Sequence, residues 1–586
     1  MFRMRKIVFV IYGIWLSACS QAVAQAQIEG ADRVLLNGKI YTVDAAKPWA
    51  EAVAIRDGRF VFVGDNSGAR EFIGNSTVVS DLGGHLVIPG IIDSHTHPGM
   101  MGLEQYGPAL PKNDPKALLA AVKAYADTVP DKQWVRMCCW PNSDYIHGRA
   151  GPDKRDLDAI VPDKPVWLTS SSWHSYWLNS KALEVLGVDR DTPDPRQGIA
   201  SYVRDDKGEL TGWVKEGAGW QHFPQVFPVD QKLLREGTVW FLDKLSENGV
   251  TTVYDGGNLD FEDEVYSILA DLDRSGKLPL RYEGTYMIYS PERRRLAIPE
   301  MRRLQAAYGG HRLKFRTIKL FMDGITAERS GAMLEPYADN PSYVGTTLLS
   351  KFELRDLLLE LNAEKFDLHV HAIGDLAVRT VLDAVQAARA AVDGEFYPRV
   401  TIAHLQSVDP ADFPRFAELG VSANFTPWWH NFARKDRDFV ALGSERSSRL
   451  YMARPLFESA ANVTFGSDDW TPDVLSPFLG MQVGHNRQLP PDWFEAGDTD
   501  VSAFLPPASE KLDMTLMIRG YTLNGAYPLR MEDQIGSIAT GKLADLVALD
   551  GNLFTMDPWM ISKTKALAVM MEGDLIHGEL QSWLAP

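Results

Sequence analysis

Two segments near the chain ends share one pattern of apolar and polar residues. From residue 28 to residue 90, short apolar runs are separated by Gly and Asp-Gly pairs, as in RVLLNGKIYTV, AVAIRDGRFVFVG and STVVSDLGGHLVIPG. The same pattern of short apolar runs and turn residues occurs again near the C-terminus, in GSIATGKLADLVALDGN and ALAVMMEGDLIHG. Short apolar runs bounded by such turn residues predict β-hairpins. We therefore predict one small β-sandwich domain built from both chain ends, residues 27–90 and 531–586.

Between these segments, helical and strand patterns alternate along the chain. Helical stretches such as DQKLLREGTVWFLDKLSENG and KFELRDLLLELNAEK lie between short apolar strands. We count eight such β units, and eight is the number that closes a parallel barrel. In chain order they are GIIDSHTH, TTVYDGG, RYEGTYMIY, FRTIKLFMDG, FDLHVHAIGD, VTIAHLQ, GVSANFTP and NVTFGSD. We predict an α/β fold, a (β/α)8 TIM-like barrel over residues 91–530.

The stretch from about residue 103 to residue 225 does not follow this alternation. It is rich in Trp, Pro and Asp and holds a further strand, KPVWLTSSS, so we interpret it as an insertion after the first barrel strand. The chain has 586 residues, of which 45% are apolar and 23% charged, as in a large globular protein. Its net charge of −17 argues against a nucleic-acid partner, because nucleic acids select basic surfaces.

The first residues have the composition of an export signal. MFRMRK carries three positive charges, and the apolar run IVFVIYGIWL that follows is too short to span a bilayer. The next residues, LSAC, match a bacterial lipoprotein signal in which Cys19 is lipidated, so residues 1–26 are predicted to be a signal peptide. The alternative is secretion without a lipid, with the signal peptide cleaved after Ala22-Val23-Ala24. Either route predicts an exported protein, in the periplasm or anchored to the outer membrane of a bacterium only through lipid.

The other two cysteines, Cys138 and Cys139, are adjacent in WVRMCCW. A disulfide between neighbouring residues is rare, so we expect two small buried apolar side chains and no disulfide framework.

Polar residues that can bind metals lie at the ends of five predicted barrel strands. They are His95, His97, Lys319, His371, His404 and Asp468. Taken singly, each has an ordinary explanation, because a lone histidine in an apolar strand is usually a core residue and a lone lysine usually reaches the surface. Barrel enzymes, however, place their chemistry at the C-terminal ends of the strands. Together these residues predict a metal site at one rim of the barrel.

The residue types fit a centre of one or two divalent ions. Imidazole and carboxylate suit zinc, and two neighbouring cations need an anion between them. Lys319 becomes such an anion if its neutral amine adds CO2 to form a carbamate, and burial in an apolar strand favours the neutral amine. Water held by the metal becomes the hydroxide nucleophile, and Asp468 takes and passes on its proton.

At these residues the sequence resembles the amidohydrolase superfamily over nearly the whole mature chain. PGIIDSHTH, KLFMDG and GSIATGKLADLVALD look like its opening motif, its carboxylated-lysine strand and its C-terminal return. The finer resemblance is to the amidohydrolase-3 branch, YtcJ-like and related to N-substituted formamide deformylases, through GELTGWVKEGA, VHAIGDLAVRTVLDAV, TIAHLQ and GSDDW. The resemblance implies a first metal on His95, His97 and Asp468, a second on His371 and His404, and a bridging carbamate on Lys319.

Substrate-binding residues are less sharply indicated. The resemblance implies that His174 in SWHSYW faces the substrate, although a structural histidine is an equal alternative, and that Glu216 in VKEGA is a candidate extra metal ligand. Trp173, Trp428 and Trp429, with Trp177 and Trp470, could form an aromatic wall or ordinary packing. NFTPWWHN and GSDDW depart from the family pattern near the expected pocket mouth, which leaves the substrate open.

We therefore predict an exported, metal-dependent amidohydrolase that cleaves a C–N bond of a small N-acyl, N-formyl or cyclic amide. A lactonase or esterase on the same metal site is the first alternative, because the same nucleophile attacks those bonds. A non-catalytic, ligand-binding lipoprotein is the second, and loss of a ligand residue would favour it. The expected partner is a small molecule, and a homodimer is compatible with the sequence.

Overall fold

The computed structural model describes residues 30–100, 106–111, 114–141, 151–433, 436–469, 474–493 and 503–580. The predicted signal peptide, its lipidation site Cys19 and the tryptophan Trp470 lie outside the described residues. Within the described part of the chain, none of the helices has the length and apolar character needed to span a bilayer.

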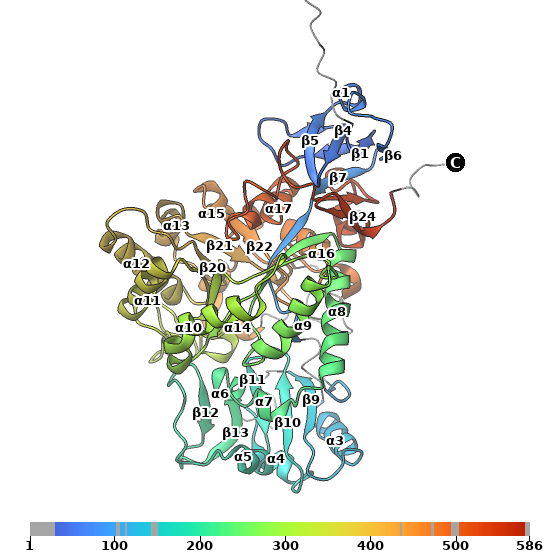
Figure 1. Cartoon of the computed structure of the whole chain (residues 1–586). Coiled ribbons are helices and arrows are strands. Elements are labelled where there is room, and N and C mark those ends of the chain that lie inside the picture. The colour runs from blue at the N-terminus through green and yellow to red at the C-terminus, as the bar shows by residue number, and fades with distance from the viewer. Residues whose placement is uncertain are drawn as a thin grey trace, which may run out of the picture.

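Two sheets at one end of the molecule are built from both ends of the chain (Figure 1). In the six-stranded sheet, β23 from the C-terminal region pairs antiparallel with β7 from the N-terminal region. The four-stranded sheet has the order β5-β4-β1-β6, with β1 (Arg33–Leu36), β4 (Ala52–Arg56), β5 (Arg59–Gly64) and β6 (Val78–Asp81). The six-stranded sheet has the order β25-β24-β23-β7-β2-β3, with β2 (Lys39–Tyr41), β3 (Trp49–Ala50), β7 (Leu86–Pro89), β23 (Leu546–Leu549), β24 (Ala566–Met571) and β25 (Asp574–Gly578).

The two terminal sheets share one apolar cluster. Leu35 and Val53 from the four-stranded sheet lie in it with Ile40, Leu546 and Met570 from the six-stranded sheet. The β4–β5 hairpin turns at the Asp-Gly pair 57–58, where both residues have positive φ (50° and 70°), as a tight hairpin turn requires. The helix α1 (Asn66–Arg70) follows β5. These contacts place strands from both chain ends around one apolar core.

The middle of the chain forms a TIM-barrel-like arrangement of parallel strands and helices. All eight predicted β units are found, in two parallel sheets with the orders β17-β15-β14-β8 and β16-β18-β19-β20-β21-β22. The third unit is split into two short strands. The bounds are β8 (Ile91–Thr96), β14 (Val250–Asp255), β15 (Arg281–Glu283), β16 (Met287–Ile288), β17 (Leu313–Lys314), β18 (Thr317–Phe321), β19 (Asp367–Ala372), β20 (Val400–His404), β21 (Ser422–Phe425) and β22 (Val463–Phe465).

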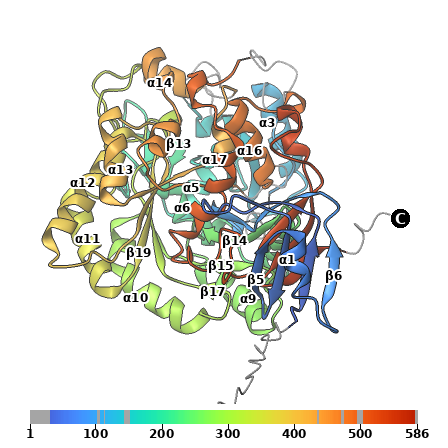
Figure 2. The same cartoon turned by 90° about the horizontal axis from the view of Figure 1, so that it is seen from above.

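Helices lie along the outer face of these strands (Figure 2). The inner face is buried as well, so both faces of the strands are covered. Burial of both faces explains why the barrel strands appear in the sequence as continuous apolar runs rather than alternating ones. The helices of this part are α8 (Gln231–Glu247), α9 (Glu262–Arg274), α10 (Pro291–Tyr308), α11 (Lys351–Glu364), α12 (Asp375–Ala391), α13 (Phe413–Leu419), α14 (Asp436–Ser447), α15 (Arg454–Glu458), α16 (Pro477–Asn486), α17 (Met514–Gly520) and α18 (Leu523–Ala526).

The segment between β8 and β14 forms a mixed sheet of its own, at the opposite end of the molecule from the terminal sheets (Figure 1). We refer to it as the insertion sheet. Its strand order is β12-β13-β11-β10-β9, with β9 (Val135–Trp140), β10 (Val166–Ser170), β11 (Ser175–Leu178), β12 (Ser201–Arg204) and β13 (Leu210–Lys215). The accompanying helices are α3 (Pro115–Ala126), α4 (Lys154–Asp158), α5 (Ser180–Leu186), α6 (Gly217–Trp220) and α7 (Phe223–Val226). The sequence pattern had indicated only one of these five strands.

The adjacent cysteines form a disulfide, so the expectation of two unpaired thiols is wrong. Cys138 lies opposite Thr169 of β10, whereas Trp140 lies opposite Ser170, which makes Cys139 the extra residue of a β-bulge with φ of 96°. In a regular strand, neighbouring side chains point to opposite faces. The bulge removes that alternation and allows the two sulfur atoms to meet.

Candidate metal centre

The six predicted metal-ligand candidates come together at the C-terminal ends of the barrel strands. His95 is in β8, Lys319 in β18, His371 in β19 and His404 at the last position of β20. These four side chains come from strands far apart in sequence, and each has 5% or less of its surface exposed. His97 directly follows β8, and Asp468 follows β22.

Asp468 is the centre of the cluster. Its Oδ1 lies 3.4 Å from Nε2 of His95 and 3.2 Å from Nε2 of His97, and its Oδ2 lies 3.2 Å from Nδ1 of His404. One side-chain nitrogen each of His95 and His404 and one carboxylate oxygen of Asp468 lie within 4.8 Å of one another. The backbone of Asp468 has a positive φ of 46°, and its N–H donates to the carbonyl of His95 at 2.7 Å. That hydrogen bond holds the end of the eighth strand unit beside the first.

Lys319 and His371 complete the group. The Nζ of Lys319 lies 3.0 Å from Nε2 of His95. The rings of His371 and His404 lie side by side, with centroids 4.4 Å apart. The structure therefore brings these side chains together around Asp468.

Burial sets the charge of these groups. It lowers the pKa of His95, His371 and His404 well below the ordinary value, with nearby Lys319 adding to the effect, so these imidazoles are neutral. Burial also lowers the pKa of Lys319 to about 7. Burial alone would raise the pKa of Asp468, but its hydrogen bond with His97 and the surrounding positive groups lower it below the usual carboxylate value. The cluster therefore offers several neutral nitrogen donors and one carboxylate near neutral pH.

Two glycines leave room for the first histidine pair. A Cβ at Gly256 would lie 2.5 Å from the His97 ring and 2.8 Å from Nε2 of His95, and a Cβ at Gly466 would lie 2.6 Å from the His95 backbone nitrogen. Any larger residue at these positions would displace the histidines. The strand ends are thus shaped to let the imidazoles approach one another.

Residues behind the candidate metal ligands hold those ligands in their orientations. Nδ1 of His95 lies 2.9 Å from Nε2 of His369, whose ring stacks on Tyr254 with centroids 4.4 Å apart. His369 precedes His371 by two positions in β19, so the two side chains share one strand face. The shared face was the only signal, because its partner His95 is 274 positions away in sequence.

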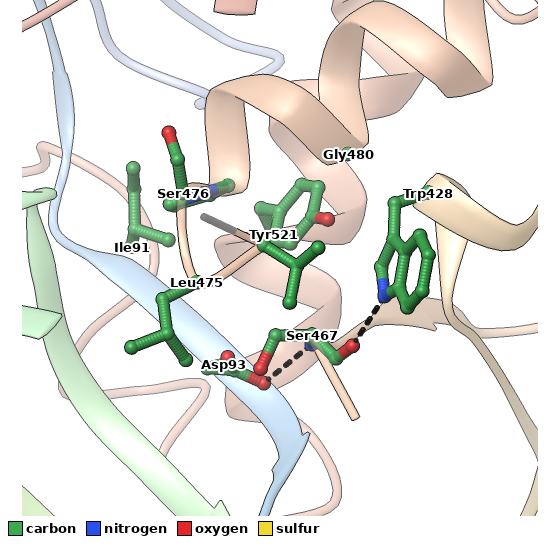
Figure 3. Close-up of a pocket in the computed structure, with 10 residues that line it drawn as sticks. Ile91, Asp93, Trp428, Ser467, Leu475, Ser476, Gly480 and Tyr521 are labelled. Atoms are coloured by element: carbon green, nitrogen blue, oxygen red, sulfur yellow. Dashed lines mark hydrogen bonds between the residues drawn. The ribbon is translucent and has the colours of Figure 1, made fainter. Parts of the chain in front are cut away.

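Asp93 links the first and last strand units, and Figure 3 shows its hydrogen bond with Ser467. Its Oδ1 accepts hydrogen bonds from the backbone N–H groups of His95 at 3.1 Å and Ser467 at 3.0 Å. Burial raises the pKa of Asp93 to about 6. The indole N–H of Trp428 donates to the carbonyl of Ser467 at 2.8 Å, so this tryptophan braces the segment that carries Asp468.

The other predicted substrate residues lie in two places. The ring of Trp429 stacks over His404 at a centroid distance of 5.4 Å. Trp173 packs against Tyr106, with centroids 5.6 Å apart, in the loop between β10 and β11. Trp429 therefore contacts the histidine cluster directly, whereas Trp177 is fully buried and packs against Trp140 of the insertion sheet.

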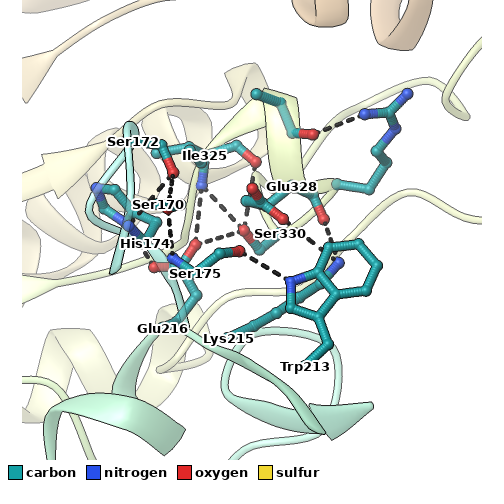
Figure 4. A network of polar contacts seen from close by, with 12 residues as sticks. Ser170, Ser172, His174, Ser175, Trp213, Lys215, Glu216, Ile325, Glu328 and Ser330 are labelled. Atoms are coloured by element: carbon teal, nitrogen blue, oxygen red, sulfur yellow. Dashed lines mark hydrogen bonds and ion pairs between the residues drawn. The ribbon is translucent and has the colours of Figure 1, made fainter. Parts of the chain in front are cut away.

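His174 and Glu216 form a close pair beside the cluster (Figure 4). Nδ1 of His174 lies 2.5 Å from Oε2 of Glu216, and the hydroxyl of Ser330 donates to Oε1 of Glu216 at 2.6 Å. The His174 ring centroid lies 6.1 Å from that of His371. Both oxygens of Glu216 are thus bound to protein donors, an arrangement that differs from the extra metal ligand suggested by the sequence.

Comparisons with known proteins agree with this picture. Residues 78–577 match the model of the amidohydrolase family. The chain is 27% identical to a putative amidohydrolase, YtcJ, of Bacillus subtilis, covering 92% of this chain and 98% of that protein. It is 25% identical to N-substituted formamide deformylase of Arthrobacter pascens, covering 89% and 93%. The predicted family resemblance is confirmed.

A solved structure shows the same fold. An uncharacterised metal-dependent hydrolase from Pyrococcus horikoshii superimposes with a TM-score of 0.66 at 22% identity, covering 90% of this chain and 99% of that chain.

Proposed function

Because the chain belongs to the amidohydrolase family, we propose that it is a metal-dependent hydrolase of C–N bonds in small N-acyl, N-formyl or cyclic amides. The observation that carries this proposal is the convergence of four histidines, Lys319 and Asp468 at the C-terminal rim of the barrel. The names of two relatives, a putative amidohydrolase and a formamide deformylase, support the bond type.

The residues present fit a divalent ion. Three buried imidazoles are neutral, so each has a nitrogen lone pair to offer, and Nε2 of His404 has no hydrogen-bond partner among the described residues. A buried polar atom without a partner costs about 1–3 kcal/mol, a cost that coordination removes. Nitrogen and carboxylate ligands together suit zinc. In this proposal His95, His97 and Asp468 hold a first ion, and His371 and His404 hold a second.

Lys319 is proposed to bridge the two ions as a carbamate. The amine must be neutral to add CO2, and a pKa of about 7 leaves a large neutral fraction near pH 7. The product is an anion, as two neighbouring cations require. Its burial at 2% exposure keeps the carbamate away from bulk water.

In the proposed reaction, Asp468 transfers the protons and His369 orients a metal ligand. A bound divalent ion polarises a carbonyl and lowers the pKa of water. Asp468 is a carboxylate at neutral pH, so it can accept the proton of the attacking water and deliver it to the leaving nitrogen. His369 holds His95 through Nδ1, which leaves Nε2 of His95 directed at the cluster.

We infer further that the eight β units close into a barrel and that the terminal sheets form a β-sandwich. The hydrogen bonds from Asp468 to His95 and from Ser467 to Asp93 support closure, and the shared apolar cluster supports the sandwich. From the sequence alone we also propose export as a lipoprotein anchored through Cys19.

A hydrolysis screen of the purified protein tests the function. The zinc-reconstituted protein is assayed on formamides, N-acyl amino acids, cyclic amides, esters and lactones, and its metal content is measured by mass spectrometry. We expect one to two equivalents of metal and turnover of an amide, both lost in His95→Gln and retained in His222→Gln. His222 is the control because it is a half-buried histidine that lies 2.8 Å from the hydroxyl of Tyr202 in the insertion.

Each other outcome has a distinct meaning. Full activity without metal refutes the metal-dependent mechanism. Turnover of lactones or esters alone replaces the bond type with the first alternative, and metal-dependent ligand binding without any turnover identifies a binding protein.

A further inference from the structure

The disulfide between Cys138 and Cys139 lies at an irregular stretch of backbone near the end of β9. Cys139 is the extra residue of the bulge, and its φ of 96° is a conformation that residues other than glycine rarely adopt. The next residue, Trp140, is 1% exposed, and its indole N–H donates to the carbonyl of Leu168 at 3.0 Å. Trp140 is therefore held in place, and the bond between the two sulfur atoms keeps Cys139 in a backbone conformation that the free residue would leave.

The peptide group between the two cysteines decides what changes when that bond is broken. Rotation of this one peptide plane converts the positive φ of Cys139 into a negative one and leaves Trp140 where it is. The rotation also turns away the carbonyl of Cys138, which accepts a hydrogen bond from the N–H of Leu110 at 3.0 Å. Leu110 is 4% exposed, so water does not readily replace this bond. The disulfide thus fixes a hydrogen bond between β9 and the segment 106–111.

That segment also packs against the loop between β10 and β11. The hydroxyl of Tyr106 lies 2.9 Å from Oγ1 of Thr169, and the Tyr106 ring contacts Trp173 with centroids 5.6 Å apart. One residue after Trp173 in this loop, the ring of His174 lies 6.1 Å from that of His371. A change in the segment therefore reaches the edge of the metal centre through one pair of stacked aromatic rings and one residue of the loop.

We propose that the Cys138–Cys139 disulfide is a redox-sensitive switch that controls the order of the segment 106–111 and of the loop beside the metal centre. Cys139 is partly exposed whereas Cys138 is 7% exposed, so a dithiol reductant reaches the sulfur of Cys139 first. Its thiolate bonds to Sγ of Cys139, and the electron pair of the S–S bond goes to Sγ of Cys138, which takes up a proton. The second thiol of the reductant then displaces Cys139, which also takes up a proton, and two protein thiols and an oxidised reductant with its own disulfide remain. The peptide group between the cysteines then turns, and the hydrogen bond to Leu110 is lost.

The test follows hydrogen exchange by mass spectrometry in the zinc-loaded, full-length protein before and after treatment with dithiothreitol. We expect reduction to speed exchange in a peptide covering residues 106–110 by roughly tenfold, because loss of one buried hydrogen bond has an effect of this order. Exchange in β14, which lies in the barrel, should not change. Alkylation followed by mass measurement shows whether the two thiols have formed.

Two substitutions separate the backbone switch from simple loss of a cross-link. Cys139→Gly removes the disulfide, but glycine adopts a positive φ without steric cost, so exchange in residues 106–110 should stay slow. Cys139→Ser removes the disulfide and keeps a side chain that disfavours this φ, so its exchange should match that of the reduced wild type. Dithiothreitol should have no effect on Cys139→Gly, which controls for loss of zinc to the reductant. If Cys139→Ser does not fold, the reduced wild type and Cys139→Gly still give the comparison.

A kinetic readout concerns regulation of the metal centre and rests on the proposed amide hydrolysis. With the amide found in the screen, the KM of Cys139→Ser should rise by about 2- to 10-fold, the cost of ordering one further side chain when substrate binds. Its metal content should be unchanged, and the KM of Cys139→Gly should stay close to that of the wild type.

The outcomes separate this proposal from the proposed function. Unchanged exchange at residues 106–110 in the reduced wild type refutes the switch, whatever the protein hydrolyses. Equal exchange in Cys139→Gly and Cys139→Ser refutes the backbone mechanism. If the wild type hydrolyses no amide, the proposed function fails, and the exchange experiment alone decides on the switch. An unchanged KM in a Cys139→Ser protein with fast exchange overturns the link to the metal centre.

Discussion

Replacing His369 by phenylalanine should weaken metal binding without disturbing the fold. His369 is hydrogen-bonded to the candidate ligand His95, whose Nδ1 lies 2.9 Å from its Nε2. A histidine that binds a metal through one nitrogen usually donates its other N–H to a fixed acceptor, which sets the ring orientation and the basicity of the ligand. Phenylalanine removes the acceptor but keeps an aromatic ring against Tyr254, where the stacked rings are 4.4 Å apart.

The size of the effect follows from the burial of the pair. His95 is 1% exposed and His369 is 3% exposed, so water cannot replace the lost hydrogen bond. Leaving a buried donor unpaired costs about 1–3 kcal/mol. Because about 1.4 kcal/mol corresponds to a factor of ten in a binding constant, the zinc dissociation constant should rise by about 10- to 100-fold. Changes to such outer partners of metal ligands typically have an effect of this order.

The assay is a competition for zinc between the metal-free protein and a chromogenic chelator, at pH 7.5 and fixed temperature. His222→Phe is the control, because His222 is a half-buried histidine that is also hydrogen-bonded, but to Tyr202 in the insertion. Thermal unfolding of the metal-free variants by circular dichroism shows whether either substitution disturbs the fold. Zinc added to the metal-free proteins should raise the melting temperature less in His369→Phe than in the wild type.

An unchanged zinc affinity in a folded His369→Phe protein would falsify the reasoning, because His95 would then need no partner at Nδ1. An equal loss in His222→Phe would show that any histidine substitution loosens the site. That result would remove the specific role of His369.

Three further predictions follow from the site and the chain ends. Lys319→Ala should reduce zinc from two equivalents to one or fewer, with partial rescue of activity by added short carboxylic acids; full metal content and rate in elemental analysis and kinetics would exclude the carbamate. Reactivation of metal-free protein by zinc and bicarbonate should rise with pH and reach half its maximum near pH 7, because burial lowers the pKa of Lys319 to about 7 and only the neutral amine adds CO2; a flat profile between pH 6 and pH 8 contradicts this. Cys19→Ser should move the protein from the membrane to the soluble fraction in cell fractionation, and unchanged fractionation would point to plain secretion.

The sequence predicted the barrel part of the site well, for a physical reason. Strands that are covered on both faces are apolar throughout, so a polar residue near the end of such a strand stands out. Parallel strands in a barrel bring their C-terminal ends to one rim, so the residues that end them must lie close together. His95, Lys319, His371 and His404 could therefore be grouped from strand order alone, without knowledge of any distance.

Features that depend on contacts outside this repeating order could not be predicted. The insertion sheet mixes parallel and antiparallel pairs, and its short strands lack the regular spacing of the barrel. The Cys138–Cys139 disulfide depends on a one-residue bulge, which no local pattern marks. The pairing of Glu216 with His174 depends on how the insertion packs onto the loop after β18, where Ser330 binds the same carboxylate.

Three residues around the predicted ligands share one property that explains why they matter. Asp93, Glu216 and His369 are all buried, and each binds a polar group of the predicted site or its neighbourhood. A buried polar side chain is stable only when its hydrogen bonds are satisfied, so its partner is fixed in place as well. The neutral imidazoles of the rim are thus oriented by groups that cannot turn away into water. Catalysis at such a site requires reacting groups to be held in position before the substrate arrives, and these three residues provide that rigidity at the points where the barrel strands and the insertion meet.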